Sequence, residues 1–537
     1  MIKQQSTSSS IGKATALIGF FSLLAKLLGL VREAIFAHQF GTSSIIGAYF
    51  ASFRIPDFIY NLLILGTFSV AFIPVFSEYV LKDRRKADEL ASSIINTTIL
   101  MVLVLTLLAF IFINPLVHAI APGFSGNDFE LTKILTKIFL LSPIFFTLSS
   151  ITASILNTYK RFALMAFAPL LYNVSIIFGA VFLYPHFGTA GLGYGVVLGA
   201  LLQFIIQMPQ VFRVGFRYTL RIVFRDSGFI KFWKLYWPRI FSMGTEQVTA
   251  LIITIFGSYI GTKALAIFYY ANNLQTVFLG IFAISFAIAV FPLLSDLFNE
   301  KNSAGFKDVL AKTAVQILFF MIPLSILTVV LRAQIVRLVL GIGQATRFSF
   351  SDTKIVAQAL GLFSISLFAQ ALIPLFTRAF YAMQNTIIPV VIGFITIASN
   401  ILITYYCIHQ FGIPGMAIAF SVTNFINLIL LIAELHYKLG DIRDEYLISS
   451  SLKIVIASLL AGSMAYVSLY IFGAIFGTST YWGVLGQGAL SGIAGGLIYL
   501  FVGWLLGLSE AANFAQVLKN TLIKFSKPIN VIWNLWP

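Results

Sequence analysis

Three charged residues lie within one long apolar stretch near the start of the chain. Lys26, Arg32 and Glu33 all fall inside residues 11–38. A charge at bilayer depth costs about 3 kcal/mol or more, and it is usually tolerated only beside a partner or a wet cavity. The stretch therefore predicts a polar pathway in a membrane helix. The alternative is an internal ion pair with Glu33 that only holds helices together.

A second charged pair stands in the next apolar stretch, where Arg54 and Asp57 flank Pro56. The two side chains either extend the same cavity or form an intrahelical pair that stabilises a helix bent at the proline. Both interpretations place charge inside a membrane segment.

The composition of the whole chain indicates a membrane protein. Of 537 residues, 59% are hydrophobic and only 10% are charged, whereas soluble domains carry roughly 25% charged residues. The formal net charge of +16 does not indicate nucleic-acid binding, because the cations lie in short loops between apolar runs.

The lone Cys407 excludes a disulfide within the chain, and His186 and His409 have no second ligand nearby. We expect no nucleic-acid partner, no metal and no cofactor.

Apolar stretches long enough to cross a bilayer follow one another along the chain. We predict an all-α membrane protein with about fourteen transmembrane helices, at residues 14–38, 45–79, 91–119, 131–158, 162–184, 189–212, 230–259, 264–298, 309–341, 354–383, 386–408, 413–437, 449–474 and 482–506. Alternate loops hold most of the Lys and Arg residues, and cytoplasmic loops carry that excess. Both termini are therefore predicted to be cytoplasmic.

Short motifs recur at a spacing of about 220 residues. Gly41-Thr42 returns as Gly261-Thr262, the segment 68–78 resembles 286–296, and 186–191 resembles 410–415. Six predicted spans separate equivalent positions, so the copies share one orientation and form two six-helix lobes related by a parallel pseudo-twofold repeat. The predicted parts are an N-lobe at 1–212, a basic cytoplasmic linker at 213–229, a C-lobe at 230–440, two further helices at 441–508 and an interfacial amphipathic tail at 509–537.

Several segments, in order along nearly the whole chain, resemble the MurJ (MviN) family of bacterial lipid II flippases. They are Gly29-Leu30-Val31-Arg32-Glu33-Ala34-Ile35, Ala121-Pro122-Gly123-Phe124, residues 155–162 followed by Ala166-Phe167-Ala168-Pro169, and Thr377-Arg378-Ala379-Phe380-Tyr381-Ala382. The family belongs to the multidrug/oligosaccharidyl-lipid/polysaccharide exporter superfamily. The resemblance implies fourteen helices in two lobes, with the last two helices forming a groove for the polyprenyl tail. It also implies basic residues at the positions of Lys26 and Arg32.

A lipid II substrate carries a pyrophosphate, and such a group requires Arg or Lys donors in a water-filled cavity. Arg32 is the foremost candidate. The chain departs from the family, in which many members have an arginine near Asn61, an acid near Leu65 and an Asp-Arg pair at the place of Asn272-Asn273. We count Asn272 and Asn273 with the substrate-binding site.

Arg239 and Glu246 are candidates to replace these missing charges. They lie seven residues apart in the seventh stretch and so share one helical face. The alternative is that Arg239 extends to the cytoplasmic interface beside Trp233 and Trp237, with Glu246 as a coupling-ion or structural acid.

From these observations we expect a monomeric lipid II flippase of the bacterial inner membrane and no enzyme activity. It would work by alternating access among membrane lipids, driven by the membrane potential or a monovalent ion. The alternatives are a flippase of another polyprenyl-linked oligosaccharide, a drug/cation antiporter of the same superfamily, and a non-transporting membrane scaffold.

Overall fold

Helices form almost all of the ordered secondary structure, as the apolar composition predicts. The computed structural model describes residues 2–64, 68–242, 244–342, 346–514 and 516, and for residues 2–16, Leu62, 238–242 and 244–246 it describes the backbone alone. No strand occurs in these ranges. In a bilayer a helix satisfies its own backbone hydrogen bonds, so an apolar chain is expected to fold this way.

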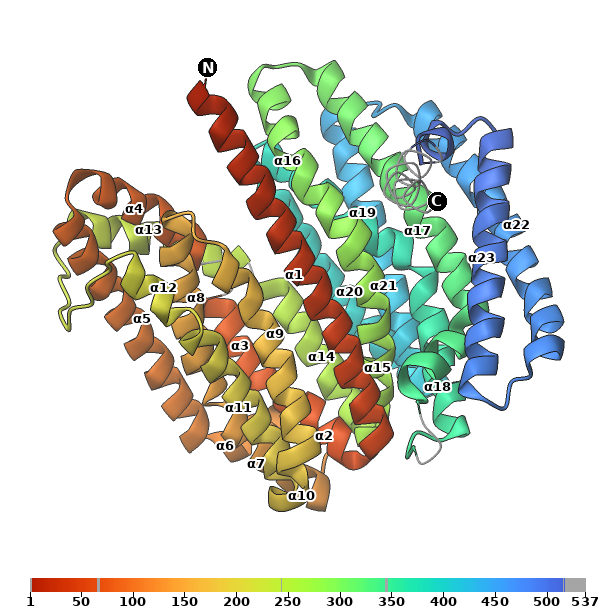
Figure 1. Ribbon diagram of the computed structural model, residues 1–537, viewed down its shortest axis with the longest axis horizontal. Helices are drawn as coiled ribbons and strands as arrows, with labels where there is room; N and C mark the ends of the chain where they lie inside the picture. The colour runs from red at the N-terminus through yellow and green to blue at the C-terminus, as the bar shows by residue number, and fades with distance from the viewer. Residues whose placement is uncertain (1, 65–67, 243, 343–345, 515, 517–537) are drawn as a thin grey trace, which may run out of the picture. The chain divides into compact units, whose positions relative to one another are not determined.

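The first half of the chain begins with one unbroken helix, α1, which carries Lys26, Arg32 and Glu33 (Figure 1). The second predicted stretch, by contrast, is divided into three helices, α2 to α4. The helices of this half are α1 (Ile2–Phe40), α2 (Ser44–Ser52), α3 (Arg54–Leu63), α4 (Phe68–Lys82), α5 (Arg84–Ile111), α6 (Ile113–Ile120), α7 (Gly126–Phe139), α8 (Ser142–Thr158), α9 (Ala163–Phe178), the π-helix η1 (Gly179–Leu183), α10 (Tyr184–Phe187), α11 (Thr189–Ile205), α12 (Met208–Arg213), α13 (Ser227–Ser242) and α14 (Gly244–Ile260).

The second half contains longer helices, and it ends with the antiparallel pair α22 and α23, drawn in blue in Figure 1. Its helices are α15 (Thr262–Phe278), the π-helix η2 (Leu279–Ala283), α16 (Ile284–Asn299), α17 (Ser303–Leu340), α18 (Phe350–Ile365), α19 (Leu367–Ala382), α20 (Ile387–Phe411), α21 (Ile413–Leu439), α22 (Asp444–Phe476) and α23 (Tyr481–Leu505).

Ten helices in the described ranges are long and apolar enough to cross a membrane. The pair α18 and α19 forms an eleventh candidate, bent by 43°. The protein is therefore a multi-pass membrane protein. Of the predicted tail 509–537, residues 509–514 and 516 are helical, and the remainder lies outside the described residues.

The helices belong to two compact units, which we describe separately. Unit 1 comprises residues 1–270, 339–352 and 397–416, and unit 2 comprises 271–338, 353–396 and 417–537. In unit 1, α1 packs against α9, and α11 packs against both α8 and α9. In unit 2, α16 packs against α19, and α22 against α23.

Two glycine turns within unit 1 have matching geometry. Gly188 and Gly412 have φ of +57° and +60°, a conformation that glycine adopts without strain, and each lies directly before a helix. Three residues later, a Cβ on Gly191 would lie 2.5 Å from the backbone of Leu183, and one on Gly415 would lie 2.1 Å from the carbonyl oxygen of Cys407. Both turns therefore require glycine at the same two positions.

Residues 214–226 of the basic linker are not helical, although the fourfold arginine spacing is compatible with a basic helical face. Between α12 and α13 the chain follows the side of α5, where polar side chains bind its backbone. Asn96 Nδ2 donates to the carbonyls of Thr219 and Arg221 at 3.1 and 2.9 Å. The amides of Thr219 and Val223 donate to Ser92 Oγ and Ser93 Oγ at 3.0 and 3.1 Å. These bonds replace the internal hydrogen bonds of a helix.

Candidate substrate-binding site

Arg32 and Glu33 form an ion pair in the last third of α1. Arg32 Nη2 lies 2.6 Å from Glu33 Oε1, and the side chains are 22% and 2% exposed. Adjacent helical residues point about 100° apart, so this close contact requires both side chains to turn toward each other. The pair satisfies the charge of Glu33 within the helical core while part of Arg32 stays accessible.

Asn173 of α9 completes this group, and sequence reasoning missed it. Arg32 Nη1 donates to Asn173 Oδ1 at 3.2 Å, and Asn173 Nδ2 donates to the carbonyls of Ala25 and Pro169 at 3.4 and 3.2 Å. The amide therefore links α1 to α9 and orients the guanidinium. The one sign of Asn173 in the sequence was an amide side chain within the apolar run 170–178.

Lys26 does not join the pair directly. Its side chain is half-buried and forms no ion pair with the described residues. Seven residues along an α-helix bring side chains back to nearly the same face, so Lys26 and Glu33 share a side of α1, about two turns apart.

Arg54 and Asp57 are in loose contact at the start of α3. Arg54 Nη2 lies 4.0 Å from Asp57 Oδ2, and the Arg54 guanidinium lies over the ring of Tyr269, 5.0 Å from its centroid. One turn later, Asn61 Nδ2 donates to Gln247 Oε1 of α14 at 3.1 Å. An amide pair thus lies at Asn61, near which the resemblance to the MurJ family implies an arginine.

The remaining predicted site residues are described apart from this group. Arg239 lies in α13 and Glu246 in α14, and both side chains lie outside the described part of the structure. Asn272 and Asn273 lie in unit 2. For these four residues, a place beside Arg32 stays a prediction.

In unit 2, Asn272 belongs to a chain of amides and hydroxyls that connects three helices. Gln275 Nε2 donates to Asn272 Oδ1 at 3.0 Å, and Gln370 Nε2 of α19 donates to Gln275 Oε1 at 3.2 Å and to Ser366 Oγ at 3.0 Å. Ser366 Oγ in turn donates to Ser421 Oγ of α21 at 3.0 Å. The network is uncharged, in keeping with the absence of the family's Asp-Arg pair.

Polar residues also gather at one end of unit 1, and sequence reasoning did not predict this group. Asp352 Oδ1 accepts from Thr42 Oγ1 at 2.7 Å and lies 3.1 Å from Lys263 Nζ. Asp352 Oδ2 accepts from the Ser349 amide and hydroxyl at 3.0 and 2.7 Å. With Thr262 Oγ1, which donates to Ser44 Oγ at 3.0 Å, we call this the end cluster: Thr42, Ser44, Thr262, Lys263, Ser349 and Asp352.

The end cluster joins the motifs that repeat in the sequence. Thr42 follows Gly41 and Thr262 follows Gly261, and both glycines have positive φ. A Cβ on Gly47 of α2 would lie 2.1 Å from the Thr262 carbonyl oxygen. The starts of α2 and α15 are therefore in close backbone contact.

Comparison with solved structures defines the class of fold. A MATE family multidrug transporter of the MOP superfamily, in an inward-facing conformation, superposes with a TM-score of 0.64 at 15% identity, over 78% of this chain and 96% of that one. The chain therefore shares the fold of that solved transporter.

Sequence comparison defines the family. The sequence model of the family described as lipid II flippase MurJ matches residues 36–486. The chain therefore belongs to that family. A solved lipid II flippase MurJ in an inward closed conformation is 27% identical with a TM-score of 0.76, covering 91% of this chain and 98% of that one.

Relatives in named bacteria agree with this assignment. The probable lipid II flippase MurJ of Buchnera aphidicola subsp. Acyrthosiphon pisum is 27% identical over 91% of this chain and 96% of its own. That of Vibrio cholerae is 29% identical over 80% and 83%. The chain is thus a multi-pass transport protein of the bacterial inner membrane, as its sequence predicted, and not an enzyme.

Proposed function

We propose that this protein is a lipid II flippase, which moves the precursor from the inner to the outer leaflet by alternating access. Membership of the family carries the proposal, and the buried group of Arg32, Glu33 and Asn173 supplies the chemistry. Arg32 is bound by one acid and one neutral amide. A phosphate oxygen can replace the Asn173 amide at Nη1 while the contact of Nη2 with Glu33 is kept.

The partial exposure of Arg32 supports transport over a structural scaffold. A scaffold would bury the ion pair on both sides, but 22% of the Arg32 side chain is accessible. Lys26, half-buried and without an ion pair among the described residues, provides a second cation on α1. In our proposal, Arg32 and Lys26 receive the pyrophosphate, while Arg54 and Asp57 border its path.

We also propose fourteen spans in two lobes related by a parallel repeat, with both termini cytoplasmic. The matching turns at Gly188 and Gly412, the positive φ of Gly41 and Gly261 and the helix-internal prolines Pro74 and Pro292 support the repeat. The basic linker lies on the cytoplasmic side in this topology, and the end cluster lies on the outer side. Breaking the end cluster would then accompany outward opening, driven by the membrane potential or a monovalent ion.

Complementation of cells depleted of their lipid II flippase tests the proposal. Growth restored by this chain, together with outward appearance of lipid II in a protease or labelling assay on spheroplasts, is the expected result. A chain that inserts stably but restores neither would overturn it. Restored export of a different polyprenyl-linked oligosaccharide, without lipid II movement, would favour that substrate.

A further inference from the structure

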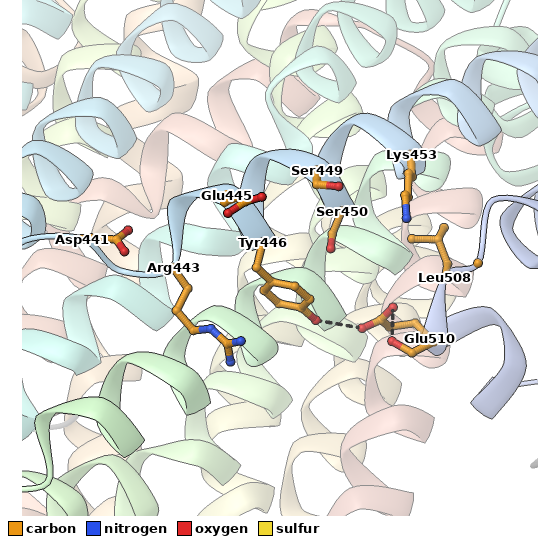
Figure 2. Close-up of a pocket in the computed structure, with 11 residues that line it drawn as sticks. Asp441, Arg443, Glu445, Tyr446, Ser449, Ser450, Lys453, Leu508 and Glu510 are labelled. Carbon is orange, nitrogen blue, oxygen red and sulfur yellow. Dashed lines mark hydrogen bonds between the residues drawn. The ribbon is translucent and has the colours of Figure 1, made fainter.

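A cavity of about 500 Å³ lies in unit 2, where α22 begins and where the chain leaves α23. Figure 2 shows the side chains of Tyr446, Ser450 and Lys453 extending from α22 toward the segment that carries Leu508 and Glu510. These residues are about one helical turn apart along α22, so they lie on one face of the helix. The cavity is separate from the group around Arg32.

Two opposite charges line this cavity without meeting. Lys453 is half-buried and makes no ion pair or hydrogen bond with the residues that the structure describes. Among the described residues, Glu510 accepts hydrogen bonds from two hydroxyls, those of Tyr446 at 3.5 Å and Ser509 at 3.1 Å. The space between them suits a ligand that has both a negative and a positive group.

Ser450 adds a polar group deep in the cavity. It is only 9% exposed, and its hydroxyl has no hydrogen bond within the described part of the chain. Because Ser450 lines the cavity and its hydroxyl is not used within the described part of the chain, this hydroxyl is available to a ligand. Ser449, on the neighbouring position of α22, also lines the cavity.

Two charged residues at the rim, Arg443 and Asp441, already have partners in the protein. Arg443 forms an ion pair with Asp308 of α17 and lies over the Tyr446 ring, 5.4 Å from its centroid. Asp441 accepts the Asp444 backbone N–H at 2.9 Å, and this bond holds the pKa of the Asp441 carboxyl below its ordinary value. Glu445 is a further, exposed acid of the lining, and Lys453 and Glu510 are the half-buried charges that a ligand can contact.

The residues around the cavity indicate that it lies at the level of the lipid headgroups in the membrane. Ile448 and Leu452 are exposed on the first turns of α22, and Phe501 and Leu505 on the last turns of α23. Trp504, 63% exposed, is a residue type enriched where the hydrocarbon meets water. Acyl chains can follow these apolar surfaces while a headgroup occupies the cavity.

We propose that this cavity binds the headgroup of a zwitterionic phospholipid of the phosphatidylethanolamine type. Lys453 and the hydroxyls of Ser449 and Ser450 hold the phosphate, and Glu510 accepts from the primary ammonium group. A phosphatidylglycerol headgroup has no ammonium, so it leaves Glu510 without a cation. Binding here is independent of lipid II movement.

Native mass spectrometry of the purified full-length protein in detergent tests the site. The protein is offered phosphatidylethanolamine, phosphatidylglycerol and diacylglycerol with identical acyl chains. We expect one tightly retained phosphatidylethanolamine, about tenfold weaker retention in Lys453→Gln, and loss of the preference over phosphatidylglycerol in Glu510→Gln. Lys438→Gln, which changes an exposed lysine outside the cavity, is the matched control and should equal the wild type.

Other outcomes have a defined meaning. Equal retention of all three lipids, or no difference between Lys453→Gln and Lys438→Gln, would overturn the proposal. So would displacement of the phosphatidylethanolamine by millimolar inorganic phosphate, because this would indicate a simple anion site. If Lys453→Gln fails to fold in a thermal unfolding assay, Ser450→Ala decides: retention several-fold weaker than the wild type supports the site, and unchanged retention rejects it.

Discussion

At the scale of single residues, the two partners of Arg32 differ in charge. Glu33 neutralises the guanidinium, whereas Asn173 only orients it. Removing Arg32 alone would therefore break the ion pair of the buried Glu33 carboxylate. Breaking a buried ion pair in this way costs about 3–5 kcal/mol, whereas removing both charges is far less costly.

This difference separates a binding role of Arg32 from a structural one. We expect Arg32→Ala to abolish lipid II transport and to lower thermal stability, and the double variant Arg32→Ala, Glu33→Gln to regain stability without regaining transport. Arg32→Lys should be intermediate, because it keeps the charge but loses the bidentate geometry. Spheroplast transport and detergent-solubilised unfolding are the two measurements. Normal transport by the double variant would contradict the role of Arg32.

Arg239 and Glu246 remain candidate replacements for the charges missing at Asn61, Leu65, Asn272 and Asn273. If they serve the cavity, neutralising both with Arg239→Ala and Glu246→Gln should reduce transport at least tenfold. Asn273→Arg should partly restore the Arg239→Ala variant if only cavity charge is required. Transport at the wild-type rate in the double variant would show that these residues have an interfacial or structural role.

The sequence was informative about Arg32 because its charge stands out in an apolar run and its partner is the next residue. It was silent about Asn173 and Asp352. Asn173 is 141 residues from Arg32, and Asp352 is 310 residues from Thr42. A neutral amide or a distant loop acid produces no local sequence pattern that points to its partner. These contacts therefore become visible only in the folded structure.

At the scale of helices, α5 serves as a support for the linker. Asn96 binds the linker at three points, since Tyr218 Oη also donates to Asn96 Oδ1 at 2.5 Å. The path of the linker could not be predicted from its own residues, because the hydrogen-bonding groups that determine it belong to α5. Apolar runs, in contrast, identified helices well, since the bilayer favours helices whatever their partners.

Replacing Asn96 should loosen the linker and leave the rest of the fold intact. Asn96→Ala removes three hydrogen bonds, each contributing about 0.5–1.5 kcal/mol. Amide hydrogen exchange over residues 217–223 should become at least tenfold faster. Thr97→Val is the control, because Thr97 Oγ1 donates only to the Ser93 carbonyl of its own helix. Equal exchange in the two variants would argue against this support.

At the scale of the whole molecule, the end cluster is a candidate gate. Asp352 gathers the Thr42 hydroxyl, the Lys263 ammonium and the Ser349 amide. If transport requires these contacts to separate, joining Thr42→Cys to Asp352→Cys with a short thiol crosslinker in a Cys407→Ala background should stop transport. Thr42→Cys alone, treated identically, should stay active. Undiminished transport by the crosslinked protein would exclude a gate at this point.

The predicted topology is open to a direct test. In the same Cys407→Ala background, a cysteine at Arg217 should be labelled only from inside, and cysteines at Gly123 and Phe411 from outside, by a membrane-impermeant thiol reagent. The physical reason is the excess of Lys and Arg in the loop set that contains Arg217. Labelling at Arg217 in intact cells would invert the proposed orientation.

The glycines after Gly188 and Gly412 also bear on the history of the chain. If an ancestral half was duplicated, most apolar positions were free to exchange Leu, Ile, Val and Phe, since lipid-facing surfaces accept any of them. Gly191 and Gly415 were not free to change, because an added Cβ would clash with the backbone at Leu183 and Cys407. Glycines at positions without room for a side chain should therefore stay recognisable in both halves after a gene duplication, even when the apolar residues around them have changed. Aligning the two halves on such glycines gives an offset of 224 residues, which places Leu183 opposite Cys407.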